Sequence, residues 1–125
     1  MNASARKAAA VEFLTLAAAG RVDDAYARHV GPAFRHHNPY FRGDAASLRE
    51  AMRANAASNP NKLFEVQRAV AEGDLVAVHS RVRQHPGDRG AVVVHIFRFD
   101  GDRIVELWDV GQATPDESPN ENGIL

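Results

Sequence analysis

The stretch that decides the fold runs from Ala91 to Val110 and reads AVVVHIFRFDGDRIVELWDV. Two runs of β-branched and aromatic residues flank the turn sequence Asp100-Gly101-Asp102. Such runs on either side of a short Gly- and Asp-rich turn are typical of an antiparallel hairpin. We therefore predict two adjacent strands, Ala91–Asp100 and Arg103–Gln112.

Two polar residues, His95 and Asp109, interrupt the apolar rows of this hairpin. Alternate residues of a strand share a face. A three-residue turn joining Phe99 to Arg103 would place His95 opposite Leu107 and Val93 opposite Asp109, so that His95 and Asp109 are diagonal neighbours on one face. A two-residue turn would separate them, because a slip of one residue sends a side chain to the other face.

The rest of the chain divides into helical and strand patterns. Apolar residues at helical spacing predict a helix from Ser4, its N-cap, through Ala19, and a second from about Val22 to Val30. A third helix is expected after Asp44 and should end at Asn59-Pro60. Two further strands are predicted, Lys62–Ala71 and Leu75–His85, and residues 32–43 are expected to be strand and loop.

This order of elements predicts an α+β domain in which three N-terminal helices pack on one face of a curved, mostly antiparallel sheet. A length of 125 residues fits one domain, with residues 114–125 as a tail that is a loop or a docking arm.

Composition excludes several classes of function. The formal net charge is -1 and the pI is about 6.6, so the chain lacks the excess of basic residues that is typical of nucleic-acid-binding domains. The chain has no cysteine, so thiolate chemistry is excluded. The apolar run near the N-terminus, residues 13–20, is too short to cross a membrane, and we expect a cytoplasmic protein.

Asp109 is the residue best suited to carry a proton. Val93, Phe97 and Leu107 would surround its carboxylate and disfavour the charged form. His95 could orient or share the proton. The alternative is structural: the two side chains would satisfy each other's hydrogen bonds in a polar corner of the core.

The segment His36-His37-Asn38-Pro39-Tyr40 supplies a second polar group. Pro39 favours an extended Asn38, whose side chain could then point inward. Adjacent residues of an extended chain point to opposite sides, so one of the two histidines should face the pocket and the other solvent. No metal-binding spacing is present, and no metal is expected.

The opposite face of the hairpin carries Arg98, Glu106, Trp108 and Val110. Arg98 and Glu106 can pair across the strands. An exposed apolar row around Trp108 favours association, so we expect a homodimer through this face.

Three segments together resemble the SnoaL-like polyketide cyclases, which have the cystatin-like cone fold of nuclear transport factor two. They are Glu72-Gly-Asp-Leu-Val-Ala-Val-His79, the hairpin from Ile96 to Val110, and His37-Asn38-Pro39. The resemblance covers about residues 5 to 112 and implies a cone-shaped α+β barrel with a deep apolar pocket, commonly dimeric.

The resemblance also implies catalytic roles for Asp109, as acid and base on the last strand, and for His95, as its helper on the preceding strand. Asn38 resembles a pocket residue of these cyclases, whereas Val93 stands where they can carry a polar side chain. The predicted substrate-binding residues are Asn38, His37, Tyr40, Val93, Phe97 and Leu107.

The predicted function is a cofactor-independent cyclase, lyase or isomerase that acts on a small apolar carbonyl compound. Asp109 would remove an α-proton, while His95 and Asn38 would polarise the carbonyl. One alternative is a noncatalytic small-molecule binding module of the same fold. Another is an epoxide-hydrolase-like enzyme, which would need Arg81 or Arg98 to point inward.

Overall fold

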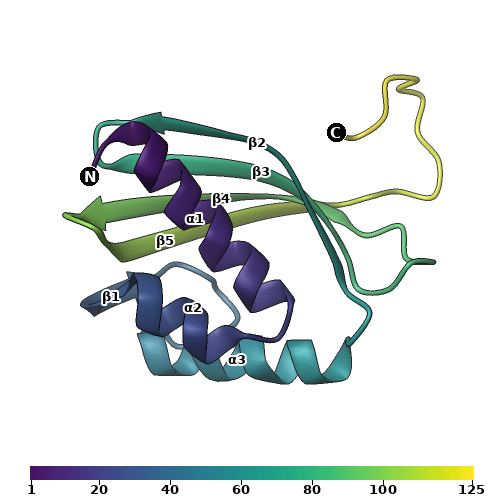
Figure 1. Cartoon of the computed structure of the whole chain (residues 1–125). Helices are drawn as coiled ribbons and strands as arrows, with labels where there is room; N and C mark the ends of the chain where they lie inside the picture. The colour runs from purple at the N-terminus through teal and green to yellow at the C-terminus, as the bar shows by residue number, and fades with distance from the viewer.

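The computed structural model describes all residues from Met1 to Leu125. Three helices and five strands make up the chain (Figure 1). In order they are α1 (Ala3–Ala18), α2 (Val22–His29), β1 (Val30–His36), α3 (Ala45–Ser58), β2 (Leu63–Glu72), β3 (Leu75–Arg83), β4 (Ala91–Asp100) and β5 (Arg103–Ala113). The helices and β2–β5 differ from the predicted bounds by one or two residues at most.

The helix ends follow from local chemistry. Asn2, rather than the predicted Ser4, caps α1, because its Oδ1 accepts a hydrogen bond from the Ala5 amide at 2.8 Å. Gly20 ends this helical segment with a φ of 86°, a conformation that glycine adopts without strain. Asp44 caps α3 as predicted, accepting from the Ser47 amide at 3.0 Å.

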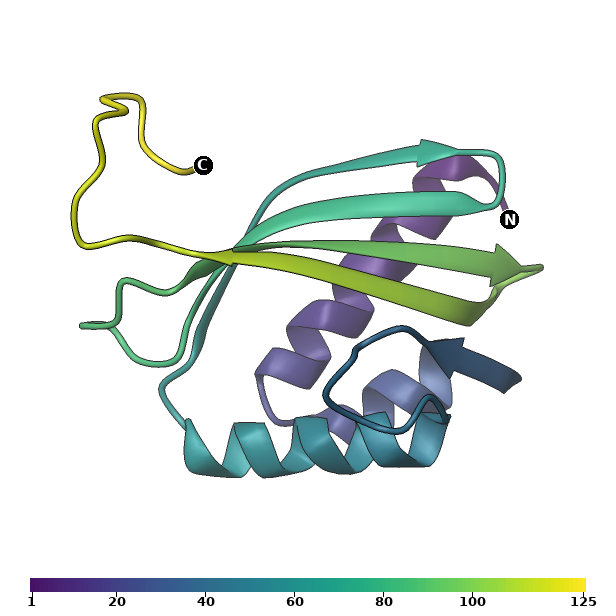
Figure 2. The same cartoon turned by 180° about the vertical axis from the view of Figure 1, so that it is seen from behind.

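The five strands form one curved, open sheet in the order β1-β5-β4-β3-β2. Three of the pairings are antiparallel, and β1 runs parallel to β5 at one edge. The helices lie on one side of this sheet, with α1 crossing it and α3 below (Figures 1 and 2). The α+β class and the arrangement of three helices on a mostly antiparallel sheet are thus confirmed.

Aromatic side chains join the helices to the sheet. Phe13 of α1 contacts Tyr26 of α2 and Phe97 of β4, with ring centroids 5.4 and 5.8 Å apart. Tyr26 in turn packs on Phe34 of β1. These residues belong to a core of sixteen buried apolar side chains, which holds α1 and α2 against the sheet and includes Leu48 of α3.

The hairpin of β4 and β5 has a register that the sequence did not predict. Asp100 pairs with Arg103, so the turn has two residues rather than three. The register then shifts between Phe99, which pairs with Ile104, and Arg98, which pairs with Glu106. One residue of β5, Val105, is therefore extra, which defines a β-bulge.

This bulge decides which face Asp109 occupies. A two-residue turn without it would place Trp108 opposite His95 and turn Asp109 to the other face. With the bulge, Asp109 lies directly opposite His95 instead of diagonal to it. The two side chains consequently share a face, as predicted, through a different pairing.

Residues 114–125 contain no helix or strand and extend beyond the end of β5 (Figure 1). No helix in the structure combines the length and the apolar character required to cross a bilayer.

Candidate functional site

A cavity of about 330 Å³ lies between the helices and the inner face of the sheet. Ten of its sixteen lining residues are apolar. The polar or charged side chains in its wall are Asn38, Asn55, Lys62, Gln84, His95 and Asp109. An apolar pocket with a few polar groups is the usual form of a small-molecule site.

Asp109 and Asn38 are joined by a hydrogen bond in the wall of this cavity. The Asn38 Nδ2 donates to Asp109 Oδ2 at 3.0 Å. The orientation of the Asn38 amide is set locally, because its Oδ1 accepts from the Tyr40 backbone amide at 3.0 Å, as in an Asx-turn. The loop after β1 thereby directs an N–H donor at the carboxylate of β5.

His36 holds the backbone of this loop in place. Its Nδ1 accepts from the Asn38 amide at 3.1 Å, and its Nε2 donates to the Arg42 carbonyl oxygen at 2.5 Å. The ring is buried and stacks on Phe34. His36 therefore positions Asn38, which in turn contacts Asp109.

His95 is a buried titratable side chain that lines the cavity. Its ring is stacked on Phe97 and tilted against Phe64, with centroids 6.2 and 6.1 Å away, and its Nδ1 is buried without a hydrogen-bond partner. Burial lowers the pKa of His95 to about 4, although the charge of Asp109 acts in the opposite direction. The ring is consequently neutral at pH 7, with one nitrogen able to donate and the other able to accept.

The predicted site residues divide into those that line the cavity and those that do not. Asp109, His95, Asn38 and Val93 line it. Phe97 and Leu107 were predicted to contact substrate, but they are fully buried beneath the cavity wall and belong to the core.

His37 and Tyr40 lie away from the cavity, contrary to the prediction. Tyr40 is 85% exposed, because the turn that orients Asn38 carries it outward. Alternation with the buried Phe34 turns His36 inward at the end of β1, and His37, the next residue, points outward. His36 stands two positions after Phe34 and His37 three, and this spacing was the signal in the sequence that distinguished the two histidines.

Outside the cavity, His37 joins a cluster on the far face of the sheet. Its ring is stacked on Trp108 at 5.1 Å, and its Nε2 lies 2.6 Å from Glu106. Arg35 and Arg98 also contact the Glu106 carboxylate, each at 3.0 Å, which confirms the predicted Arg98–Glu106 pair. These partners, His37 above all, hold the pKa of Glu106 at about 2.

Three polar residues of the cavity were missed by the sequence analysis. Lys62 precedes β2, and its Nζ donates to Asn55 Oδ1 of α3 at 2.5 Å. Gln84 follows β3, and its Oε1 is buried without a hydrogen-bond partner. Lys62 stands two positions before Phe64, and this spacing was the available signal that both side chains face the same way.

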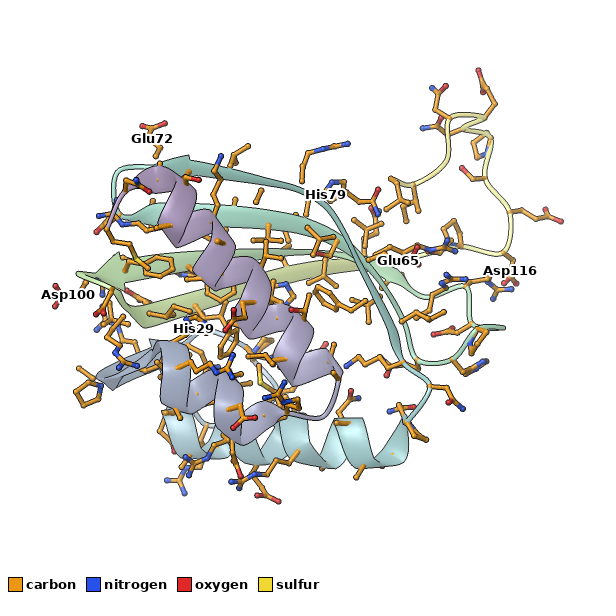
Figure 3. The ribbon with its side chains drawn as sticks, viewed as in Figure 1. His29, Glu65, Glu72, His79, Asp100 and Asp116 are labelled. Atoms are coloured by element: carbon orange, nitrogen blue, oxygen red, sulfur yellow. The ribbon has the colours of Figure 1, made fainter.

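Other charged groups lie outside the cavity. Figure 3 shows Glu72 and Asp100 projecting outward at hairpin ends and Asp116 on the tail. Arg98 contacts Glu106, Arg81 contacts the Arg89 carbonyl oxygen, and no arginine is among the lining residues. The epoxide-hydrolase-like alternative therefore lacks the inward arginine that it needs.

The family model of the SnoaL-like domain matches residues 10–107. A search of curated proteins finds no significant match.

Solved structures with the same fold support this match. AclR, a candidate hydroxylase from Streptomyces galilaeus, superimposes with a TM-score of 0.73 at 23% identity, over 90% of this chain and 81% of that one. A SnoaL-like protein of unknown function from Burkholderia thailandensis gives 0.72 at 19% identity, over 88% and 96%. A candidate polyketide cyclase from Acidithiobacillus ferrooxidans gives 0.60 at 21% identity, over 83% and 88%. At these identities the likeness concerns the fold.

Proposed function

Because the chain belongs to the SnoaL-like domain family, we propose that it is a cofactor-independent acid–base enzyme acting on a small apolar carbonyl compound. The observation that carries the proposal is the cavity wall in which Asp109, His95 and Asn38 meet. Similar folds include proteins described as a candidate isomerase from Agrobacterium tumefaciens and the candidate cyclase above.

The proposed reaction begins with proton removal. The Asp109 carboxylate takes a proton from the carbon next to the substrate carbonyl, and the bonding electrons move onto the carbonyl oxygen to give an enolate. The neutral His95 ring donates a hydrogen bond to that oxygen, and the second N–H of Asn38 is free to do the same. Both donors are held in place before the reaction, which favours the charged intermediate.

The enolate can then react in three ways that all use the same residues. A proton returned by Asp109 to a different carbon gives an isomerase. Attack of the enolate carbon on a second carbonyl gives an aldol cyclase, with the proton going to the new alkoxide. Expulsion of a leaving group, protonated by Asp109, gives a lyase.

Exchange of α-protons with solvent tests the first step without knowledge of the natural substrate. The probe is the apolar ketone β-tetralone in D₂O, with deuterium uptake followed by NMR. We expect the wild type to exceed the buffer rate and Asp109→Asn to lose about a hundredfold to ten-thousandfold of that acceleration. Asp109→Asn should still bind the ketone and melt near the wild-type temperature.

The matched control is Asp102→Asn, which removes an exposed carboxylate in the β4–β5 turn and should leave exchange unchanged. Exchange by Asp109→Asn at the wild-type rate would reject Asp109 as the base. A wild type that binds the ketone without accelerating exchange would favour the noncatalytic binding module.

We also propose a homodimer through the outer face of the sheet. Val110 is 66% exposed there, and Leu75 and Val70 add further exposed apolar surface. An apolar hollow on this face, lined by residues that include Ala77 and Ile96, offers a place for side chains of a second copy.

A further inference from the structure

One positively charged side chain, Lys62, lines the cavity and has no carboxylate partner. Lys62 Nζ donates to Asn55 Oδ1, and none of the ion pairs in the structure includes Lys62. An ammonium group has three N–H donors, so two remain for a ligand. Lys62 and Lys7 are the only lysines among the fifteen basic residues of the chain.

The surroundings of Lys62 leave its charge uncompensated. The side chain is half-buried, and burial lowers the pKa of Lys62. The charged groups that could face it inside the cavity are His95, which is neutral, and Asp109, whose carboxylate is bound by Asn38. The cavity therefore offers a positive charge without a carboxylate partner, which an anionic ligand can supply.

A second polar atom at the same end of the cavity lacks a partner. Lys62 precedes Leu63 and Gln84 follows Arg83, the residue that pairs with Leu63, so both lie just beyond the same end of the β2–β3 pair. The Gln84 Oε1 is buried and accepts no hydrogen bond. Lys62 therefore leaves N–H donors and Gln84 leaves an acceptor at the same end of the cavity.

The distance from this end of the cavity to the proposed acid–base pair limits the size of the ligand. Phe64 contacts the His95 ring, and Lys62 stands two residues before it, which is roughly 7 Å along an extended chain. The charge of Lys62 also lowers the pKa of His95, as expected for a neighbouring cation. One small molecule can span both groups.

We propose that the cavity takes a carbonyl compound that carries a carboxylate, with Lys62 binding the carboxylate while the carbonyl faces Asp109 and His95. This inference rests on the proposed function and narrows its substrate class. A carboxylate suits a single ammonium group. A phosphate monoester is less well matched, because it carries up to about two negative charges at pH 7 and Lys62 is the one lysine or arginine that lines this cavity.

Binding of a matched pair of probes tests the inference. Benzoylpropionate carries a ketone and a carboxylate, and its methyl ester has the same skeleton without the charge. By isothermal titration at pH 7, we expect the wild type to bind the acid at least about tenfold more tightly than the ester. Lys62→Met keeps the length of the side chain and should abolish this preference.

Lys7→Met is the matched control, because it removes the other lysine, which lies on α1 outside the cavity. It should keep the full preference for the acid. As pH rises, the wild type should lose its preference for the acid at a pH below the range in which lysine ordinarily titrates. The reason is that burial lowers the pKa of Lys62, so its ammonium group loses its proton at a lower pH.

Equal binding of acid and ester by the wild type would overturn the inference, as would a preference that survives in Lys62→Met. Tighter binding of phenyl phosphate than of benzoylpropionate would overturn the carboxylate as the preferred group. The wild type separates the two proposals. A preference for the acid without accelerated proton exchange rejects the catalysis alone, whereas accelerated exchange without a preference for the acid rejects the role of Lys62 alone.

Discussion

Protonation of His95 should destabilise the fold, and His95→Gln should remove this effect. The pKa of His95 is about 4 in the folded protein, against about 6.5 for an unfolded histidine. Between these values the unfolded chain binds the proton and the folded protein does not, so stability is lost as pH falls. The shift corresponds to about 3 kcal/mol of unfolding free energy between pH 6.5 and pH 4.

Urea denaturation of the wild type and His95→Gln, at several pH values from 8 to about 4, measures this quantity. The difference in unfolding free energy between the two proteins isolates His95 from the other titrating groups. We expect that difference to be constant above pH 7 and to shift by about 3 kcal/mol against the wild type by pH 4. His85→Gln, in the exposed loop before β4, should reproduce the wild-type profile.

A difference that stays flat between pH 6.5 and pH 4 would refute the reasoning, because it would mean that the folded protein accepts a proton on His95 as readily as the unfolded chain. The proposed role of His95 as a neutral donor would then fail as well.

Two further outcomes concern the outer face. Glu106→Gln should lower the unfolding free energy at pH 7, since the carboxylate is bound by Arg35, His37 and Arg98. Because the folded-state pKa of Glu106 is about 2, this stabilisation is present above pH 4.5 and should disappear as pH falls toward 2. If Glu106→Gln still lowers the unfolding free energy by the same amount at pH 2, the ion-pair explanation is contradicted. Val110→Asp should convert the proposed dimer to a monomer in light scattering, whereas a wild type that is monomeric at high micromolar concentration would reject the dimer.

Local patterns in the sequence were sufficient for the fold class and for several residues that line the cavity. Helix caps, glycine turns and strand alternation depend on neighbouring residues, so the three helices and four of the strands could be placed to within two residues. His95 and Asp109 were recognisable because each is a polar residue in an apolar row. Asn38 was recognisable because Pro39 restricts its backbone.

Tertiary structure decided where those residues meet. The bulge at Val105 turns Asp109 toward His95, and a bulge depends on how two strands pair rather than on the sequence of either one. The sequence analysis placed His37 in the pocket, whereas in the structure the buried Glu106 and the ring of Trp108 hold His37 on the other face of the sheet. The spacing of Lys62 and Phe64 indicated only which way the Lys62 side chain faces, whereas its place in the cavity beside Asn55 depends on the separate helix α3. The sequence by itself thus determined the elements and the polar residues of the inner face, while long-range pairing and packing determined which of them surround one cavity.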